Sequence, residues 1–319
     1  MDDDGHGGAG RRARPPFDSP AELVAALDEQ DYLADEEMAT ACYLALALGR
    51  PLFLEGMAGV GKTAVAGALA RSLEAPLIRL QCFEGIDAHQ ALYDWDFPRQ
   101  LLHLRAAEAA GRHEAPDVLE HELYGRRFLV PRPLLQSLET SPCVLLIDEI
   151  DRSDDEFEAL LLELLSDFAV SIPELGTVRA ETPPVVVVTS NRTREVHDAL
   201  KRRCLYHWVE NPSYEREVAI ILRRLPQVHE RLAERVAFAT RRLRARDLLK
   251  PPGVAEALDW AESLAALGAD DLSPALASTT LGSVLKYKED IEQVRATGLA
   301  ALLDGAGLEE VGLEGVGGG

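Results

Sequence analysis

The chain has 319 residues, and its 54 acidic side chains outnumber the 33 lysines and arginines, which gives a formal net charge of −21. Contacts to phosphates dominate the affinity of nucleic-acid-binding proteins, so this acidic balance argues against a nucleic-acid partner. No run of 18 apolar residues occurs and the first residues are polar and glycine-rich, so we expect no transmembrane segment, no signal peptide and a cytoplasmic location.

The length exceeds that of a typical single domain, and composition along the chain predicts two domains between two tails. Residues 1–17 and 305–319 are rich in glycine and hold too little apolar surface to pack, so we expect flexible tails there. Between them we predict an α/β domain over residues 18–211 and a small all-α domain over residues 212–304.

A glycine-rich loop follows the first predicted strand, which covers residues 51–55 (PLFLE). The loop reads GMAGVGKT, a complete G-x-x-x-x-G-K-[ST] pattern, and a helix-forming segment comes next, which an ordinary glycine turn would not explain. Its glycines let backbone N–H groups surround an anion, its lysine reaches the β- and γ-phosphates, and its threonine hydroxyl can bind Mg²⁺. We expect these residues to bind a nucleotide: Gly56, Met57, Ala58, Gly59, Val60, Gly61, Lys62, Thr63 and Ala64.

Paired carboxylates follow a second apolar strand, Cys143–Ile147, so Asp148 should lie at its carboxyl end, where open α/β sheets bind ligands. We expect Asp148 and Thr63 to hold Mg²⁺ and Glu149 to polarise the attacking water as general base. Asp151 could assist them, but we favour a cap for the next helix. With the phosphate loop, this motif predicts hydrolysis of a nucleoside triphosphate.

Two later motifs complete the expected site. A strand over residues 183–191 (PPVVVVTSN) ends on Asn191, which could orient the lytic water or could form a turn. Lys201, Arg202 and Arg203 then precede a strand-like LYHWV segment. Arginines placed here cannot easily face their own nucleotide but can face a neighbour's, as an arginine finger supplied in trans does.

Together with residues 76–82 (PLIRLQC), these segments predict five parallel strands separated by helices, in a three-layer α/β domain. After Asn211 only helix patterns occur, which predicts the all-α domain. The cysteines at 42, 82, 143 and 204 are scattered in apolar settings without C-x-x-C spacing, so we expect reduced core residues and no structural metal.

The order of these motifs resembles that of the AAA+ ATPases, and finer features over residues 52–267 resemble the MoxR group and its CoxD subgroup. The segments that carry this likeness are residues 80–108, 148–180, 189–195 and 199–208. The resemblance implies the AAA+ three-layer domain with an all-α lid, a homo-oligomeric ring that we expect to be a hexamer, and ATP with Mg²⁺ as cofactors.

The resemblance also implies roles for single residues. Asn191 would be sensor 1, Arg203 the leading arginine finger with Arg202 beside it, and Gln81 the residue on the second strand that senses the γ-phosphate. Many MoxR proteins carry Ser-x-Arg at the start of a lid helix, whereas this chain reads LKPPGVAEALDW. Lys250 is therefore the candidate for sensor 2.

Two insertions could carry the specificity for a substrate. In the first, Tyr93, Trp95 and Phe97 form an aromatic cluster, for which we favour core packing over contact with a partner. The second follows an amphipathic helix over residues 157–168 and is hairpin-like around Glu174-Leu175-Gly176. It resembles the MoxR hairpin that faces the pore of the ring; a solvent-exposed edge hairpin is the alternative.

By resemblance, the protein would be a chaperone that uses ATP to remodel or mature a metalloenzyme such as a carbon monoxide dehydrogenase-like molybdenum hydroxylase. A protein with a von Willebrand factor A domain would be its partner. Two other classes stay open. A nucleic-acid-translocating ATPase could use a basic stripe of the late arginines, and a nucleotide-gated scaffold would bind ATP with little turnover, although Glu149 argues against it.

Overall fold

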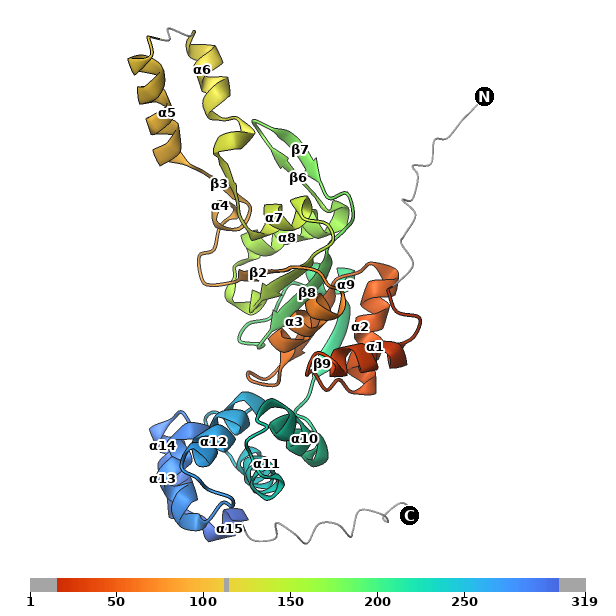
Figure 1. Cartoon of the computed structure of the whole chain (residues 1–319), viewed down its shortest axis with the longest axis vertical. Helices are drawn as coiled ribbons and strands as arrows, with labels where there is room; N and C mark the ends of the chain where they lie inside the picture. The colour runs from red at the N-terminus through yellow and green to blue at the C-terminus, as the bar shows by residue number, and fades with distance from the viewer. Residues whose placement is uncertain (1–15, 112–114, 304–319) are drawn as a thin grey trace. The chain divides into compact units, whose positions relative to one another are not determined.

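The computed structural model describes residues 16–111 and 115–303. The chain divides into two compact units (Figure 1). The first comprises the residues up to Gly56 and Lys62–Val209, and the second comprises Met57–Gly61 and the residues from Glu210 onwards. The two predicted tails lie outside the described residues except for positions 16 and 17, where Phe17 is buried.

The first unit is built on a five-stranded parallel sheet with the order β2-β5-β8-β1-β9 (Figure 1). The strands are β1 (Leu52–Gly56), β2 (Leu77–Gln81), β5 (Val144–Asp148), β8 (Val185–Ser190) and β9 (Leu205–Val209). All five lie within a residue or two of the predicted segments, so the predicted sheet is confirmed. Because the strands are parallel, their carboxyl ends meet at one edge, and β2 and β5 align Gln81 with Asp148 there.

Helices cover both faces of this sheet and give it three layers. Their bounds are α1 (Pro20–Asp28), α2 (Glu36–Leu48), α3 (Lys62–Ser72), α4 (Ala88–Ala91), α7 (Pro133–Glu139), α8 (Asp155–Asp167) and α9 (Asp198–Arg203). Strand side chains alternate between the faces, so Phe53, Leu145 and Ile147 join the buried cluster with α7, α8 and α9. On the other face α3 contacts β1, β2, β5 and β8.

The first insertion lies between β2 and β5. It comprises β3 (Tyr93–Trp95), α5 (Phe97–Ala109), α6 (Pro116–Leu123), a 3₁₀ turn (Arg126–Phe128) and β4 (Leu129–Pro131). Strands β3 and β4 form an antiparallel ribbon, and α5 and α6 project from it away from the main sheet (Figure 1). The aromatic cluster is divided: Tyr93 and Trp95 pack edge to face with their centroids 6.0 Å apart, whereas Phe97 is 61% exposed.

The second insertion is an antiparallel hairpin of β6 (Ala169–Ile172) and β7 (Gly176–Arg179). The predicted hairpin shape is confirmed. Its tip is not simply exposed, because Leu175 packs on a small buried cluster of Leu129, Leu135 and Ile172, which Trp95 of the first insertion also contacts. The two insertions therefore share one hydrophobic cluster.

The second unit is helical throughout its described part beyond residue 209. Its helices are α10 (Tyr214–Arg224), α11 (Glu230–Arg244), α12 (Val254–Ala266), α13 (Pro274–Val284), α14 (Lys288–Ala296) and α15 (Ala300–Leu303). Trp260 is fully buried in their core and donates its indole N–H to Thr280 Oγ1 at 2.8 Å. Arg244 binds buried Glu217 through both guanidinium ends, at 2.5 and 2.8 Å.

Two further predictions concern the whole chain. The cysteines at 42, 82, 143 and 204 are all free and buried, and burial raises the pKa of each thiol above its ordinary value, to about 12 for Cys42. Their prediction as core residues is confirmed. Within the two described ranges, no helix combines the length and the apolar character that a membrane crossing needs.

Candidate functional site

Thr63 and Asp148, the two predicted magnesium ligands, lie next to each other. Thr63 is in the first turn of α3, and its Oγ1 donates to Asp148 Oδ1 at 3.1 Å; Thr189 Oγ1 donates to the same oxygen at 2.5 Å. The Asp148 carboxylate is buried at the carboxyl end of β5. Mg²⁺ prefers oxygen ligands and keeps several of its waters, so a hydroxyl beside a buried carboxylate fits this ion.

The phosphate loop has the backbone conformation that its glycines predict. Gly59 and Gly61 have φ values of +81° and +97°, which residues other than glycine rarely adopt. Gly56 is required for another reason: a Cβ there would lie 2.4 Å from the Val209 carbonyl oxygen, because β1 and β9 pair closely. The loop therefore depends on glycine at three positions.

Lys62 is 5% exposed, and its Nζ donates to the Gly56 carbonyl oxygen at 2.8 Å. Burial lowers the pKa of Lys62 to about 8, although nearby carboxylates, with Asp151 and Asp148 foremost, act in the opposite direction. A buried ammonium group gains most from an anionic partner, so this lysine fits a phosphate.

Glu149 has left-handed backbone angles, φ 57° and ψ 51°, which cost a non-glycine residue free energy and cluster at functional sites. Its amide donates to Thr189 Oγ1 at 3.0 Å. Its carboxylate accepts from Asn191 Nδ2 at 3.2 Å and from Gln81 Nε2 at 3.1 Å, and Arg152 Nε lies 3.0 Å away. Three residues predicted from separate motifs, Gln81, Glu149 and Asn191, are thus brought into direct contact.

Asp151 does not cap the following helix, so that prediction is wrong. Asp151 lies within the 3₁₀ turn Ile150–Arg152, before α8 begins, and Asp154 is the cap of α8, accepting from the Phe157 amide at 2.9 Å. Asp151 is 3% exposed and accepts from the Thr193 amide, the Thr193 hydroxyl and the Asn191 amide at 2.8, 2.6 and 3.1 Å. Burial acts to raise the pKa of Asp151, but these hydrogen bonds outweigh it and the pKa lies below its ordinary value. Asp151 therefore anchors the loop after β8.

The sequence reasoning missed Arg79. This residue lies on β2, and its Nη2 is 2.5 Å from Asp148 Oδ2 and 2.6 Å from Gln81 Oε1. The sequence offered one indication: Arg79 and Gln81 are two residues apart on one predicted strand, so their side chains lie on the same face of the sheet. In the alternating burial of β2, however, such an arginine looks like an ordinary solvent-facing residue.

Arg202 and Arg203 lie apart from the Asp148 cluster, at the end of α9. Both are exposed, Arg203 Nη1 donates to the Leu162 carbonyl oxygen on α8 at 3.2 Å, and Arg50 donates to the backbone carbonyls of both arginines. Just before them, Lys201 Nζ lies 3.4 Å from Glu55 Oε2, at the end of β1. The arginines are therefore held by α8 and α9 in an exposed position.

Lys250 belongs to the second unit, where its amide donates to Asp290 Oδ2 at 3.2 Å and its Nζ is 4.0 Å from Glu256 Oε1. Glu256 also accepts from the Gly253 amide, at the N-terminus of α12. In the same unit, the Gly59 carbonyl accepts from the Val254 and Ala255 amides.

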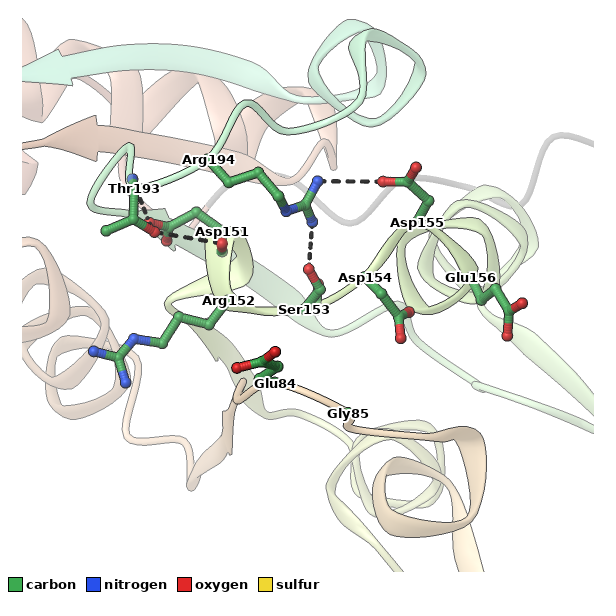
Figure 2. A pocket seen from close by; sticks show the side chains of 10 residues that line it. All are labelled: Glu84, Gly85, Asp151, Arg152, Ser153, Asp154, Asp155, Glu156, Thr193 and Arg194. Carbon is green, nitrogen blue, oxygen red and sulfur yellow. Dashed lines mark hydrogen bonds and ion pairs between the residues drawn. The ribbon is translucent and has the colours of Figure 1, made fainter.

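Asp151 also lines a pocket of about 930 Å³ (Figure 2). Figure 2 shows the Asp151–Thr193 contact at one end of it and Arg194 reaching Asp155 and Ser153 at the other. Its acidic lining residues are Glu84, Asp151, Asp154, Asp155 and Glu156. Five carboxylates against two arginines would repel a triphosphate, so this pocket is unsuited to the nucleotide.

Residues 51–204 match the family model of the AAA domain, dynein-related subfamily. This range contains Lys62, Thr63, Asp148, Glu149 and Asn191. Together with their geometry, the match shows that the chain is an ATPase that uses ATP and Mg²⁺.

No curated protein matches the chain significantly. Among solved structures, a mutant of RuvB from Thermotoga maritima is 18% identical, with 77% of this chain and 67% of that chain covered and a TM-score of 0.46. The Holliday junction branch migration motor RuvB of the same organism is 17% identical, with 81% and 68% covered and a TM-score of 0.43. Similarities this low do not support an inference about what the protein acts on.

Proposed function

We propose that the protein is a MoxR-type chaperone ATPase that works as a homo-oligomeric ring, expected to be a hexamer, in the cytoplasm. It remodels or matures a metalloenzyme, of which a carbon monoxide dehydrogenase-like molybdenum hydroxylase is the expected kind, with a von Willebrand factor A domain protein as partner. The main support is the pair of insertions. Both pack on the hydrophobic cluster that includes Leu129 and contacts Leu175, so they add an ordered region to the ATPase core. The proposed domain limits remain residues 18–211 and 212–304.

For the chemistry, bound Mg²⁺ neutralises charge on the phosphates of ATP, and the protein supplies positioning and proton transfer. Lys62 neutralises phosphate charge, and Thr63 and Asp148 hold the metal. Glu149 takes the proton of the attacking water. Asn191 and Gln81 hold the two carboxylate oxygens of Glu149, at 3.2 and 3.1 Å, and so orient the base before the water is activated.

Contacts from neighbouring copies complete the proposed site. Arg203, with Arg202 beside it, stabilises the charge that develops on the γ-phosphate in the next subunit. The exposed position of both arginines on α9 supports this role. Lys250 is the proposed sensor 2; its exposed ammonium group, paired loosely with Glu256 at 4.0 Å, is available to a phosphate.

The chemistry of the first unit bears on the two rival functions. A DNA- or RNA-translocating ATPase would need basic surfaces, whereas the pocket beside Asp151 has an acidic lining and the net charge is −21. A scaffold with little turnover would not need a strained glutamate held by Gln81 and Asn191 beside the metal carboxylate.

The test measures steady-state ATP hydrolysis by the full chain, alone, with the von Willebrand factor A partner and client enzyme, and with single- or double-stranded DNA at low salt. We expect the protein partners to raise turnover and DNA to leave it unchanged. Leu175→Ser should weaken the response to the partners while basal hydrolysis persists, with Thr177→Ser on the same hairpin as control. Stimulation by DNA alone would contradict the chaperone function.

A further inference from the structure

Both oxygens of the Asp148 carboxylate already have partners. Thr63 and Thr189 donate to Oδ1, and Arg79 donates to Oδ2 at 2.5 Å. The arginine reaches it because β2 and β5 are neighbours: Gln81 is aligned with Asp148, and Arg79 lies two residues earlier on the same face of β2. A fixed positive charge therefore lies directly against the carboxylate that is to hold the metal.

The same guanidinium nitrogen also fixes the amide of Gln81. Arginine can only donate hydrogen bonds, so the Gln81 atom 2.6 Å from Nη2 must be the carbonyl oxygen. The amide nitrogen then points to Glu149 Oε2, at 3.1 Å, and an ionised carboxylate can only accept. Arg79 thus determines which end of Gln81 faces Glu149. A continuous chain of hydrogen bonds runs from Asp148 through Arg79 and Gln81 to Glu149.

The setting of Arg79 differs from that of a simple stabilising ion pair. Its side chain is 52% exposed while that of Asp148 is 4% exposed, so water screens the arginine and limits what the pair adds to folding stability. The charge of Arg79 has a separate effect on metal binding. The guanidinium next to Asp148 repels a metal ion bound to the same carboxylate and so lowers the affinity for that ion.

We propose that Arg79 is a positioning residue for ATP hydrolysis, which couples the metal carboxylate Asp148 to the base Glu149 through the Gln81 amide. It does two things at once: it orients Gln81 towards Glu149, and it weakens the hold of Asp148 on the metal. This inference rests on the roles proposed above for Asp148 and Glu149, but not on the chaperone function.

The two effects make an unusual combined prediction for Arg79→Ala. Without the guanidinium, Gln81 is free to rotate and kcat should fall roughly 10-fold, less than the roughly 10²-fold or more that a general base contributes, because Glu149 is still present. Metal binding should move the other way: the dissociation constant for Mn²⁺ in the presence of ADP, measured from the EPR signal of free Mn²⁺, should decrease roughly 3- to 10-fold because a repelling charge is gone. Damage to the fold would instead lower both kcat and the affinity for Mn²⁺.

Two further variants separate charge from geometry. Arg79→Lys keeps the charge but has no planar fork to bridge Asp148 and Gln81, so Mn²⁺ affinity should stay near that of the unchanged protein while kcat falls. Arg105→Ala, which removes an exposed arginine from α5, is the matched control and should change neither quantity.

The outcomes distinguish the alternatives. Lower kcat with tighter Mn²⁺ binding and an unchanged melting temperature supports the proposal. Weaker Mn²⁺ binding with a lower melting temperature in Arg79→Ala would make Arg79 a structural residue, and unchanged kcat and Mn²⁺ affinity would make it an ordinary surface arginine; either result overturns the proposal. Because neither readout uses the partner or client, failure of the chaperone function would leave this test intact.

Discussion

Asp151 and Thr193, 42 residues apart in the sequence, are joined twice: the Thr193 amide and hydroxyl both donate to Asp151 Oδ2, at 2.8 and 2.6 Å. The Asn191 amide donates to the other carboxylate oxygen at 3.1 Å. Asp151 thereby ties the loop that carries Asn191 to the turn that carries Glu149, and the distance between these two catalytic candidates depends on it.

We therefore expect Thr193→Val to lower kcat with little change in ATP affinity, because the hydroxyl bond to Asp151 is lost and Asn191 is less well held. Removing a partner of a buried carboxylate should also cost about 1 to 3 kcal/mol of unfolding free energy. Turnover, nucleotide binding and urea unfolding measure these effects. Thr177→Val on the exposed face of β7 is the control, and equal effects in both variants would exclude a specific role for Asp151.

Gly56→Ala should destabilise the first unit. The new Cβ would lie 2.4 Å from the Val209 carbonyl oxygen, and since that atom belongs to the backbone, β1 and β9 would have to separate. Overpacking of this kind costs about 1 to 3 kcal/mol or more. Gly67→Ala in α3 is the matched control, since its Cβ has room and alanine in a helix is favoured by about 1 kcal/mol. Thermal unfolding should therefore shift in opposite directions for the two variants.

ATP affinity should fall as the pH rises above about 8. Burial lowers the pKa of Lys62 to about 8 in the free protein, so its charge is progressively lost above this pH. Phosphate favours the charged form, so the complex binds more protons than the free protein, and affinity must decrease with pH. Calorimetry in buffers of different ionisation enthalpy should show proton uptake approaching one at pH 9 and little at pH 7. A flat affinity between these values would contradict the shifted pKa.

Arg203→Ala should lower kcat by roughly 10³-fold while ATP affinity is retained, as expected for an arginine supplied in trans. Mixing Arg203→Ala with Lys62→Ala subunits should restore part of the activity, because one interface then combines an intact pocket with an intact arginine. Subunit exchange must be confirmed by labelled chains. If exchanged rings recover nothing, Arg203 does not act across an interface.

The main sheet could be predicted because each strand is a short apolar run closed by a polar or glycine-rich motif. Those local patterns also predict Lys62, Thr63, Asp148 and Glu149 as site residues. Asp151 was misassigned because the 3₁₀ turn Ile150–Arg152 holds it before α8, and no local pattern in the sequence shows that α8 begins only at Asp155 with Asp154 as its cap.

The contact of Arg79 with Asp148 could not be recognised because it depends on strand order. The sequence indicates that β2 and β5 exist, but not that they are neighbours, and only this pairing places Arg79 against Asp148. The same holds for the insertions: Leu175 of the hairpin and Trp95 of the ribbon are 80 residues apart but pack on the same cluster, which no local pattern encodes.

The most direct test of the account compares Lys62→Ala with Glu149→Gln, measuring binding of a fluorescent ATP analogue and single-turnover hydrolysis on the same samples. Loss of the buried ammonium should remove nucleotide binding, because the phosphate charge is no longer neutralised. Loss of the Glu149 carboxylate should leave binding intact and reduce hydrolysis by roughly 10²-fold or more, because the water lacks its base. Equal loss of affinity in both variants, or normal hydrolysis in Glu149→Gln, would contradict the assignment of Glu149 as the base.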